Sequence, residues 1–390
     1  MQEIVPNDKC VGCSACANIC PKQCIQMCPD TEGFLYPLIE QSRCINCGLC
    51  VKSCPVIVNP LMPEVEMTKA YAAISKNEPI RLESSSGGFF SVLSEWVFEH
   101  DGIVFGAAYA EDFSVVHCAA TNMEDMRKLR TSKYSQSVIG DTFQQVRKFL
   151  REDKYVLFSG TPCQVAGLQS YLKKPYERLI LVDMICHGVP SPRVWENYLT
   201  YRKNKDAPFS EIRAINLRDK KTGWPDYSIL FEYMDGTIYS LKGNQDPFLR
   251  GFLHDFYLRP SCYECSFKGI ARQSDFTLAD YWGIERQFPE YYDGKGTSLL
   301  FLHSQKATNI WQEVESGLFY KEVNPEDAIK ENPSAIRATQ KPNNRSEFWQ
   351  LYPDKDFDDL IEELIPKPVA PKCVLIKRGI SKIKRILKNL

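Results

Sequence analysis

The sequence has no long apolar segment and no excess of charge of either sign. No apolar run in the 390-residue chain approaches the roughly 18 residues needed to cross a lipid bilayer. The 48 Lys and Arg residues are balanced by 49 Asp and Glu residues, for a formal net charge of -1. Nucleic acid is therefore not an expected partner. Because no secretion signal is recognisable, we expect a cytoplasmic protein, soluble or peripheral to the inner face of the membrane.

Cysteine, in contrast, is abundant, with 16 in the chain. Eight of these fall in two runs that share the spacing C-x2-C-x2-C-x3-C-P. In bacterial ferredoxins with this spacing, three cysteines of one run and the fourth of the other hold each [4Fe-4S] cluster. One predicted ligand set is Cys10, Cys13, Cys16 and Cys54, and the other is Cys44, Cys47, Cys50 and Cys20. Zinc is the main competitor, but four-cysteine zinc sites usually consist of two separated pairs. Cysteines at ligand spacing also favour a reducing compartment over disulfides.

The chain is too long for a ferredoxin alone, since domains usually have about 100–200 residues. The dicluster domain is predicted over residues 1–58, and a segment with two prolines, residues 59–66, is typical of a linker. A second domain then begins near Lys69, with a strand at residues 69–75 and a helix at residues 89–98.

Two polar segments of this second domain are candidates for cofactor binding. The first, ESSSGG at residues 83–88, precedes the predicted helix, where hydroxyls, backbone amides and the helix dipole suit a phosphate. The second, RTSKYSQS at residues 130–137, precedes a helix predicted at residues 142–150, and Lys133 is placed to stabilise negative charge on a reduced ring. Each has a structural alternative: a helix N-cap and turn for the first, and a solvated helix entry for the second.

A βαβ unit is predicted from residue 155 to residue 185, with two parallel buried strands around a short helix. A cysteine follows each strand, and ligands in open α/β sheets gather outside the carboxyl ends of strands. A C-x2-C pair lies further along the chain. The four cysteines concerned are Cys163, Cys186, Cys262 and Cys265. They suffice for a third [4Fe-4S] cluster or a zinc site, and unligated core cysteines are the remaining alternative. His187 is expected to be an oriented structural imidazole.

The segments ESSSGGFFSVL, SKYSQS, GTPCQVAGL, VDMICHGVPSP, SCYECSFKG and ARQSDFTLADYWGI, placed behind the dicluster module, resemble the coenzyme F420 hydrogenase/dehydrogenase beta-subunit family over about residues 1–335. The layout looks most like the F420H2 dehydrogenase input subunit. The resemblance implies a ferredoxin fold followed by a mixed α/β flavin-binding domain, with family regions at residues 67–150 and 151–335. It also implies FAD, a face for the deazaflavin coenzyme F420, and a third cluster on the four cysteines above. The residues it assigns to flavin contact are Ser85, Ser86, Gly87, Gly88, Ser132, Lys133 and Tyr134. Asp275 and Asp280, at the ends of a predicted strand, are candidates for the active site or for turn capping.

The resulting hypothesis is an oxidoreductase that links a hydride carrier to a one-electron carrier. A deazaflavin exchanges only a hydride and a cubane cluster passes one electron, so a flavin must stand between them. Lys133 is the candidate catalytic residue, and the expected partners are a ferredoxin or other redox protein and a small hydride donor or acceptor. Two alternatives stay open: a ferredoxin-linked flavin reductase of another metabolite, such as a sugar intermediate, and an Fe-S electron-carrier subunit without catalysis.

The sequence beyond the family region, residues 336–390, is predicted to be an extension. High charge and proline content predict a loosely packed segment at residues 332–359. Residues 372–390 carry seven basic and no acidic side chains at near-helical apolar spacing. Such a helix suits an anionic membrane surface, its own domain or a partner protein.

Overall fold

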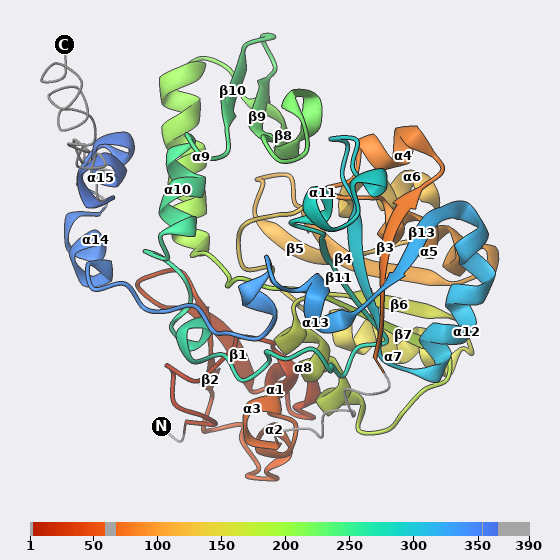
Figure 1. Cartoon of the computed structure of the whole chain (residues 1–390). Coiled ribbons are helices and arrows are strands. Elements are labelled where there is room, and N and C mark those ends of the chain that lie inside the picture. The colour runs from red at the N-terminus through yellow and green to blue at the C-terminus, as the bar shows by residue number, and fades with distance from the viewer. Residues whose placement is uncertain (1–2, 59–67, 353, 366–390) are drawn as a thin grey trace, which may run out of the picture.

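The computed structural model describes residues 3–58, 68–352 and 354–365. The predicted linker at residues 59–66 and the basic C-terminal helix at residues 372–390 lie outside these ranges. Within them the chain has a mixed α/β architecture in three parts: a small N-terminal module, a large central sheet with helices on both faces, and a helical lobe with a second sheet (Figure 1). None of the helices in the described ranges combines the length and apolarity needed to span a bilayer.

The N-terminal module, residues 3–58, contains both predicted ferredoxin cysteine runs. Its elements are α1 (Ala15–Ile19), β1 (Ile25–Pro29), β2 (Leu35–Ile39), α2 (Leu49–Lys52) and α3 (Pro55–Val58). The strands pair antiparallel, with Ile25 opposite Ile39. The module lies against α8 (Pro162–Leu172) of the central domain, which α1 and α3 contact directly.

The central sheet has the strand order β13-β3-β12-β11-β7-β6-β4-β5. Its strands are β3 (Lys69–Ser75), β4 (Ile103–Tyr109), β5 (Val115–Ala120), β6 (Val156–Ser159), β7 (Leu179–Met184), β11 (Phe276–Asp280), β12 (Ser298–Leu302) and β13 (Leu318–Val323). The four strands β11, β7, β6 and β4 run parallel, and the outer strands pair antiparallel. The predicted βαβ unit is therefore confirmed, as is the strand at residues 69–75.

Helices cover both faces of this sheet because its central strands are apolar on both sides. Leu157 packs on the face covered by α5 (Phe89–Glu99) and α12 (Gln305–Val314). Its neighbours Val156 and Phe158 pack on the opposite face, under α7 (Thr142–Arg151) and α8 (Pro162–Leu172). Shorter helices at the edges are α4 (Glu78–Leu82), α6 (Met123–Met126), α11 (Ile284–Gln287) and α13 (Pro325–Ala328). Strands from both predicted family regions thus form one sheet.

The third part is the lobe at residues 191–258, joined by helices from the end of the chain. Its elements are α9 (Pro192–Asp206), β8 (Ile212–Asp219), β9 (Ser228–Tyr233), β10 (Ile238–Lys242), α10 (Pro247–Leu253), α14 (Arg345–Leu351) and α15 (Phe357–Leu364). Strands β9 and β10 form an antiparallel hairpin, with Gly236 at a φ of 88° in the turn.

The prediction of a loosely packed segment at residues 332–359 is wrong. Phe348, Tyr352 and Phe357 are buried and belong to the aromatic core of the lobe. Helix α15 lies so close to α10 that a Cβ on Gly251 would come within 2.7 Å of the Ile361 side chain. The apolar side chains of this segment recur at helical spacing between charged and proline residues. They are therefore buried along one face of each helix, although the segment as a whole is rich in charge and proline.

Candidate functional site

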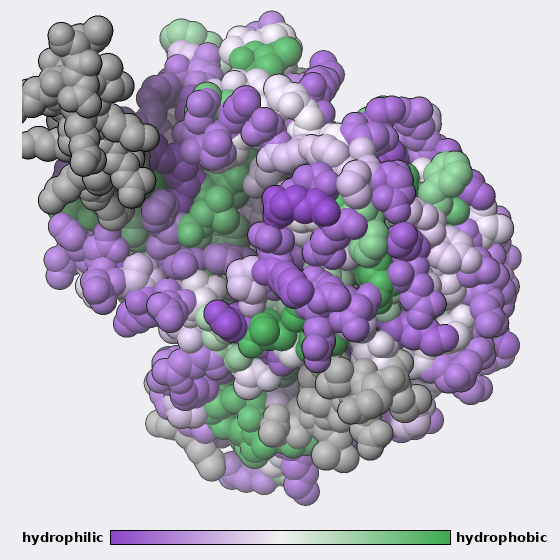
Figure 2. Space-filling view, in the orientation of Figure 1, coloured by the Kyte–Doolittle hydropathy of each residue, from purple (hydrophilic) through white to green (hydrophobic). Residues whose placement is uncertain are grey.

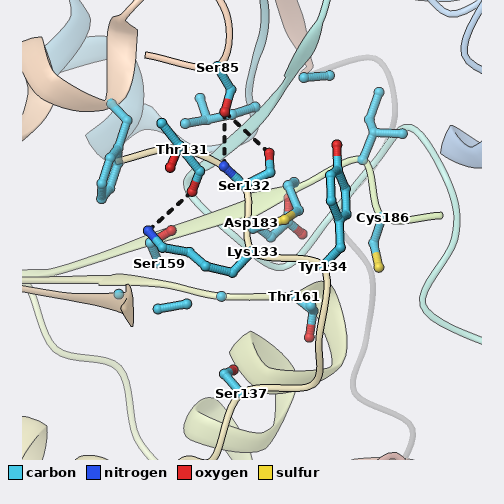
Figure 3. Close-up of a pocket in the computed structure, with 18 of the residues that line it drawn as sticks. Ser85, Thr131, Ser132, Lys133, Tyr134, Ser137, Ser159, Thr161, Asp183 and Cys186 are labelled. Carbon is cyan, nitrogen blue, oxygen red and sulfur yellow. Dashed lines mark hydrogen bonds between the residues drawn. The ribbon is translucent and has the colours of Figure 1, made fainter. Parts of the chain in front are cut away.

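A cavity of about 350 Å³ opens at the carboxyl ends of the parallel strands (Figure 3). Because β4, β6, β7 and β11 run in the same direction, the loops that follow β6, β7 and β11 meet at one edge of the sheet. This edge is where open α/β sheets bind ligands. The walls include the ESSSGG loop, the segment at residues 130–137, and the strand ends that carry Cys163 and Cys186.

The ESSSGG loop is held to the central sheet by most of its own polar groups. The Ser86 hydroxyl donates to the Thr297 carbonyl at 2.8 Å, and the Gly87 amide donates to the Ser298 hydroxyl at 2.9 Å. Gly87 is required by packing, since a Cβ there would lie 2.3 Å from the Ala73 carbonyl oxygen. Fewer hydroxyls and amides face a ligand than the sequence suggested. What remains is the start of α5, where Gly88 has a φ of 93° and no side chain caps the helix.

The two predicted cofactor-binding segments meet at the cavity. The Ser132 amide donates to the Ser85 hydroxyl at 2.9 Å, and the two serine hydroxyls lie 3.3 Å apart (Figure 3). Arg130 ties the same segments together, because its guanidinium pairs with Glu83 and donates to the Ser91 hydroxyl. Segments 47 residues apart in the chain thereby form one wall.

Lys133 lines this wall, but its ammonium is turned toward the backbone. It donates to the Lys128 carbonyl at 2.8 Å and to the Thr131 carbonyl at 3.2 Å, and it forms a short contact with the Arg130 carbonyl. Burial lowers the pKa of Lys133 to about 7, and the nearby Cys118 thiol opposes that shift. An amine with this pKa carries a proton for part of the time near neutrality, so its charge can respond to a ligand.

His117 lines the same cavity, although no sequence motif marks it as a site residue. Its Nε2 lies 3.0 Å from the Ser159 carbonyl oxygen, which can only accept, so Nε2 carries the proton. Its Nδ1 is buried and has no hydrogen-bond partner among the described residues. Burial lowers the pKa of His117 to about 4, so the ring is neutral and Nδ1 is a bare acceptor. A buried unpaired acceptor in a cavity wall is a natural contact for a ligand N–H.

Aromatic and charged side chains surround Asp280, which lines the cavity. Asp280, at the end of β11, accepts from Arg218 at 2.8 Å and from the Trp224 indole at 2.9 Å. The Arg218 guanidinium lies 4.0 Å from the centre of the Tyr227 ring. Asp280 thus belongs to the cavity, whereas Asp275 at the other end of β11 accepts from the Leu181 amide and the Ser304 hydroxyl and serves the fold.

The four cysteines of the predicted third metal site come together at the base of the cavity. Burial raises the pKa of the Cys163 thiol to about 12, and the neighbouring Cys265 and Cys186 thiols add to the rise. The Cys262 sulfur accepts from the Val189 amide at 3.5 Å. Cys163 and Cys186 line the cavity itself. Among the described residues no group of three His, Cys, Asp or Glu side chains is set for a single metal ion, in the ferredoxin module or here. His187 is an oriented structural imidazole, with Nε2 2.6 Å from an Asp255 oxygen.

The ferredoxin cysteines divide between two cavities in the crossed pattern that the spacing predicts. The proximal cavity, nearer the central domain, is lined by Cys10, Cys13, Cys16 and Cys54. The distal cavity is lined by Cys20, Cys44, Cys47 and Cys50. It also contains Cys24, which has no partner at ligand spacing in the sequence and whose sulfur lies 3.4 Å from that of Cys20.

The proximal cysteines lie directly against the helix that begins beside Cys163. A Cβ on Gly167, one turn further along α8, would lie 2.8 Å from the Cys13 sulfur. The Cys13 thiol lies within electrostatic reach of Cys163: burial raises its pKa well above the usual value, and Cys163 is among the thiols that add to the rise. The order in space therefore starts at the cavity beside the strand ends, called the large cavity below. The set of Cys163, Cys186, Cys262 and Cys265 comes next, followed by the proximal set and then the distal set.

Two family models match separate parts of the chain. Residues 153–328 match the family model for the C terminus of the beta subunit of coenzyme F420 hydrogenase/dehydrogenase. Residues 9–58 match the 4Fe-4S dicluster domain. One chain in a xenon-derivatised structure of the F420-reducing [NiFe] hydrogenase complex from Methanosarcina barkeri is 16% identical, with a TM-score of 0.43, over 75% of this chain and 87% of that one. No curated protein matches the chain. The resemblance drawn from the motifs is confirmed by the two family models.

Proposed function

We propose, on the premise that this chain joins a 4Fe-4S dicluster domain to the C-terminal domain of the coenzyme F420 hydrogenase/dehydrogenase beta-subunit family, that it passes electrons between an F420-type hydride carrier and a one-electron carrier. The observation that carries the proposal is the large cavity. One wall consists of the segments assigned to flavin contact, and the base carries cysteines of the third metal site. A ligand in this cavity would therefore contact both.

The residues around the cavity fit FAD. The uncapped N-terminus of α5 suits a pyrophosphate, and the His117 Nδ1 acceptor suits a ring N–H. Lys133 is placed to supply positive charge, and Tyr134 offers an aromatic surface at the rim. When bound, FAD supplies the conversion between a hydride and two single electrons. The protein supplies the orientation of the reacting groups and the exclusion of water.

The cysteine sets fit a linear relay away from the cavity. Cys163, Cys186, Cys262 and Cys265 would hold a third [4Fe-4S] cluster, adjacent to the proximal cluster on Cys10, Cys13, Cys16 and Cys54. The distal cluster, on Cys20, Cys44, Cys47 and Cys50, would be the outlet. Iron is favoured over zinc at the third site because Cys13 touches the helix that starts beside Cys163, so a redox-inactive ion there would interrupt the relay.

The surface around the distal cavity fits a redox partner. Cys47 is exposed, and five large apolar side chains of the same module are exposed, of which Ile45 and Val51 line the distal cavity together with Cys47. The five are Leu38, Ile45, Val51, Ile57 and Val58. Figure 2 shows apolar surface gathered on this module at the bottom of the view. Contiguous exposed apolar surface marks sites of protein association, so a ferredoxin or another redox protein is expected to dock here.

Anaerobic purification with quantitation of iron, sulfide and flavin tests the proposal. Three cubes predict about twelve irons per chain, together with one FAD. Cys163→Ser should reduce the iron to about eight per chain with little effect on the ferredoxin clusters. If the iron content does not change in that variant, the four cysteines of the third set bind zinc or are unligated core residues. F420H2 and NAD(P)H should then be compared as reductants. Bleaching of the flavin by NAD(P)H alone would contradict the deazaflavin assignment, and absence of flavin would reduce the chain to an electron carrier.

A further inference from the structure

Arg259 is a fully buried cation whose charge is not balanced by a carboxylate. Its side chain joins the ferredoxin module to the central domain and has 1% of its surface exposed. It donates to the Cys10 carbonyl at 2.7 Å, to the Leu35 carbonyl at 3.0 Å and to the Gln136 side-chain oxygen at 2.8 Å. Within the described part of the chain, all these acceptors are neutral and Arg259 forms no ion pair.

The location of Arg259 is fixed by close packing on the first cysteine loop. Gly12 has a φ of 67°, and a Cβ there would lie 2.7 Å from the Arg259 guanidinium and 2.6 Å from the Gln136 amide nitrogen. Gln136 in turn donates to the Val11 carbonyl at 3.2 Å and lines the large cavity. Arg259 and Gln136 therefore connect the loop of the proximal cluster with the wall of the cofactor cavity.

A buried guanidinium requires compensation, because taking an ion out of water costs several kcal/mol when its charge is unbalanced. Once clusters are bound, the cysteines of the two sets beside Arg259 would be thiolates and would provide negative charge. Arg259 is bonded to the backbone of Cys10 in the proximal set, and its positive charge also acts on the Cys163 thiol in the third set. Reduction would make the cluster on either cysteine set more negative, because the cluster gains one electron while the charges around it do not change.

We propose that Arg259 is the shared counter-charge of the proximal and third clusters and raises their affinity for an electron. It acts as a positioning residue and not as a ligand. One-electron reduction adds one negative charge to a cluster, forms and breaks no bond, and needs no proton, because the guanidinium remains protonated throughout. This inference rests on the proposed function, because it requires clusters on both cysteine sets.

The test is a redox titration of anaerobic, iron-loaded protein followed by electron paramagnetic resonance. Arg259→Met should lower the reduction equilibrium constant of the most affected cluster by about tenfold, which is about 59 mV for one electron. Arg259→Lys retains the charge and should stay within about twofold of the parent protein. Gln136→Glu places a carboxylate beside the guanidinium and should shift the reduction potential in the same direction as Arg259→Met. It therefore tests the role of the Arg259 charge if the methionine variant cannot be loaded with iron.

The matched control is the double variant Glu32→Gln with Arg345→Met. It removes the ion pair between Glu32 of the ferredoxin module and the buried Arg345 of α14, in which Nη1 of Arg345 lies 2.9 Å from a Glu32 oxygen. The net charge of the protein stays unchanged. Its potentials should match those of the parent protein. Equal potentials in Arg259→Met and in this control would overturn the inference and reduce Arg259 to a structural tie. Parent protein without clusters would instead defeat the proposed function.

Discussion

Gly167 provides the sharpest test of how the ferredoxin module docks. It lies in the middle of α8, where replacement of glycine by alanine ordinarily stabilises a helix by about 1 kcal/mol. Here the added methyl would lie 2.8 Å from both Cβ and Sγ of Cys13. Cys13 is 7% exposed and sits in a loop that Gly12 locks against Arg259, so it has little room to move away.

The expected result of Gly167→Ala follows from two opposing terms. Overpacking of a tight contact costs about 1–3 kcal/mol, and the helix gain of about 1 kcal/mol offsets part of it. We therefore expect a net loss of up to about 2 kcal/mol, although the same change in a free helix would stabilise it. Because the displaced thiol belongs to the proximal set, the variant should also lose about four irons.

Iron content and anaerobic urea unfolding measure the two effects on the same sample. Gly317→Ala is the control, since the nearest atom to its added methyl would be a Val92 carbon at 3.7 Å, an ordinary contact. If Gly167→Ala keeps the full iron content and unfolds at the same urea concentration as the control, the module does not dock on α8 in this way, and the adjacency of the proximal and third sets fails with it.

Three further changes test other parts of the structure. Phe348→Ala should destabilise the protein by about 3–5 kcal/mol in urea unfolding, because the ring is fully buried; a loss below about 1 kcal/mol would restore the loosely packed C-terminal segment. Ser85→Ala leaves the Ser132 amide without its acceptor, which loosens the cavity wall. The free energy of flavin binding should therefore weaken by about 1–3 kcal/mol, as measured by equilibrium dialysis. Burial lowers the pKa of Lys133 to about 7 from 10.5, so the unfolded chain holds a proton that the folded chain has released between these values. Stability relative to Lys133→Met should therefore rise with pH across that window and be flat below it; a flat difference throughout would refute the lowered pKa of Lys133.

Local patterns in the sequence were sufficient to predict the elements that carry the site. The strands β6 and β7 are short apolar runs that are each followed within four residues by a cysteine, and a parallel pair must bring the segments after its strands to one edge. The cysteine spacing likewise determined the crossed sets of the ferredoxin module. Both predictions rest on patterns that span a few tens of residues, a range over which hydrophobic periodicity and cysteine spacing are informative about structure.

The contacts that the sequence did not reveal are all distant in the chain. Arg259 meets Gln136 across 123 residues and Cys10 across 249, and nothing in the local sequence of either marks it as a partner. His117 was missed because its distinguishing feature, an unpaired Nδ1, exists only after Ser159 has taken the other ring nitrogen. The C-terminal helices were missed because their apolar residues are covered by α9 and by the segment from α10 to Tyr257, which lie about a hundred residues or more earlier.

These distant contacts bear on whether the ferredoxin module is a tethered carrier or a fixed part of the enzyme. A carrier that swings between partners needs an interface with few specific bonds, as weak transient contacts have. This interface instead uses positions that tolerate no side chain: Gly12 against Arg259, and Gly33, at a φ of 85°, where a Cβ would lie 2.7 Å from the Arg193 amide nitrogen. A buried ion pair between Glu32 and Arg345 closes the same face. Release of the module would expose all these groups together, so the proposed relay from the cavity to the distal set would operate at a fixed distance, and any motion in electron delivery would belong to the proposed redox partner.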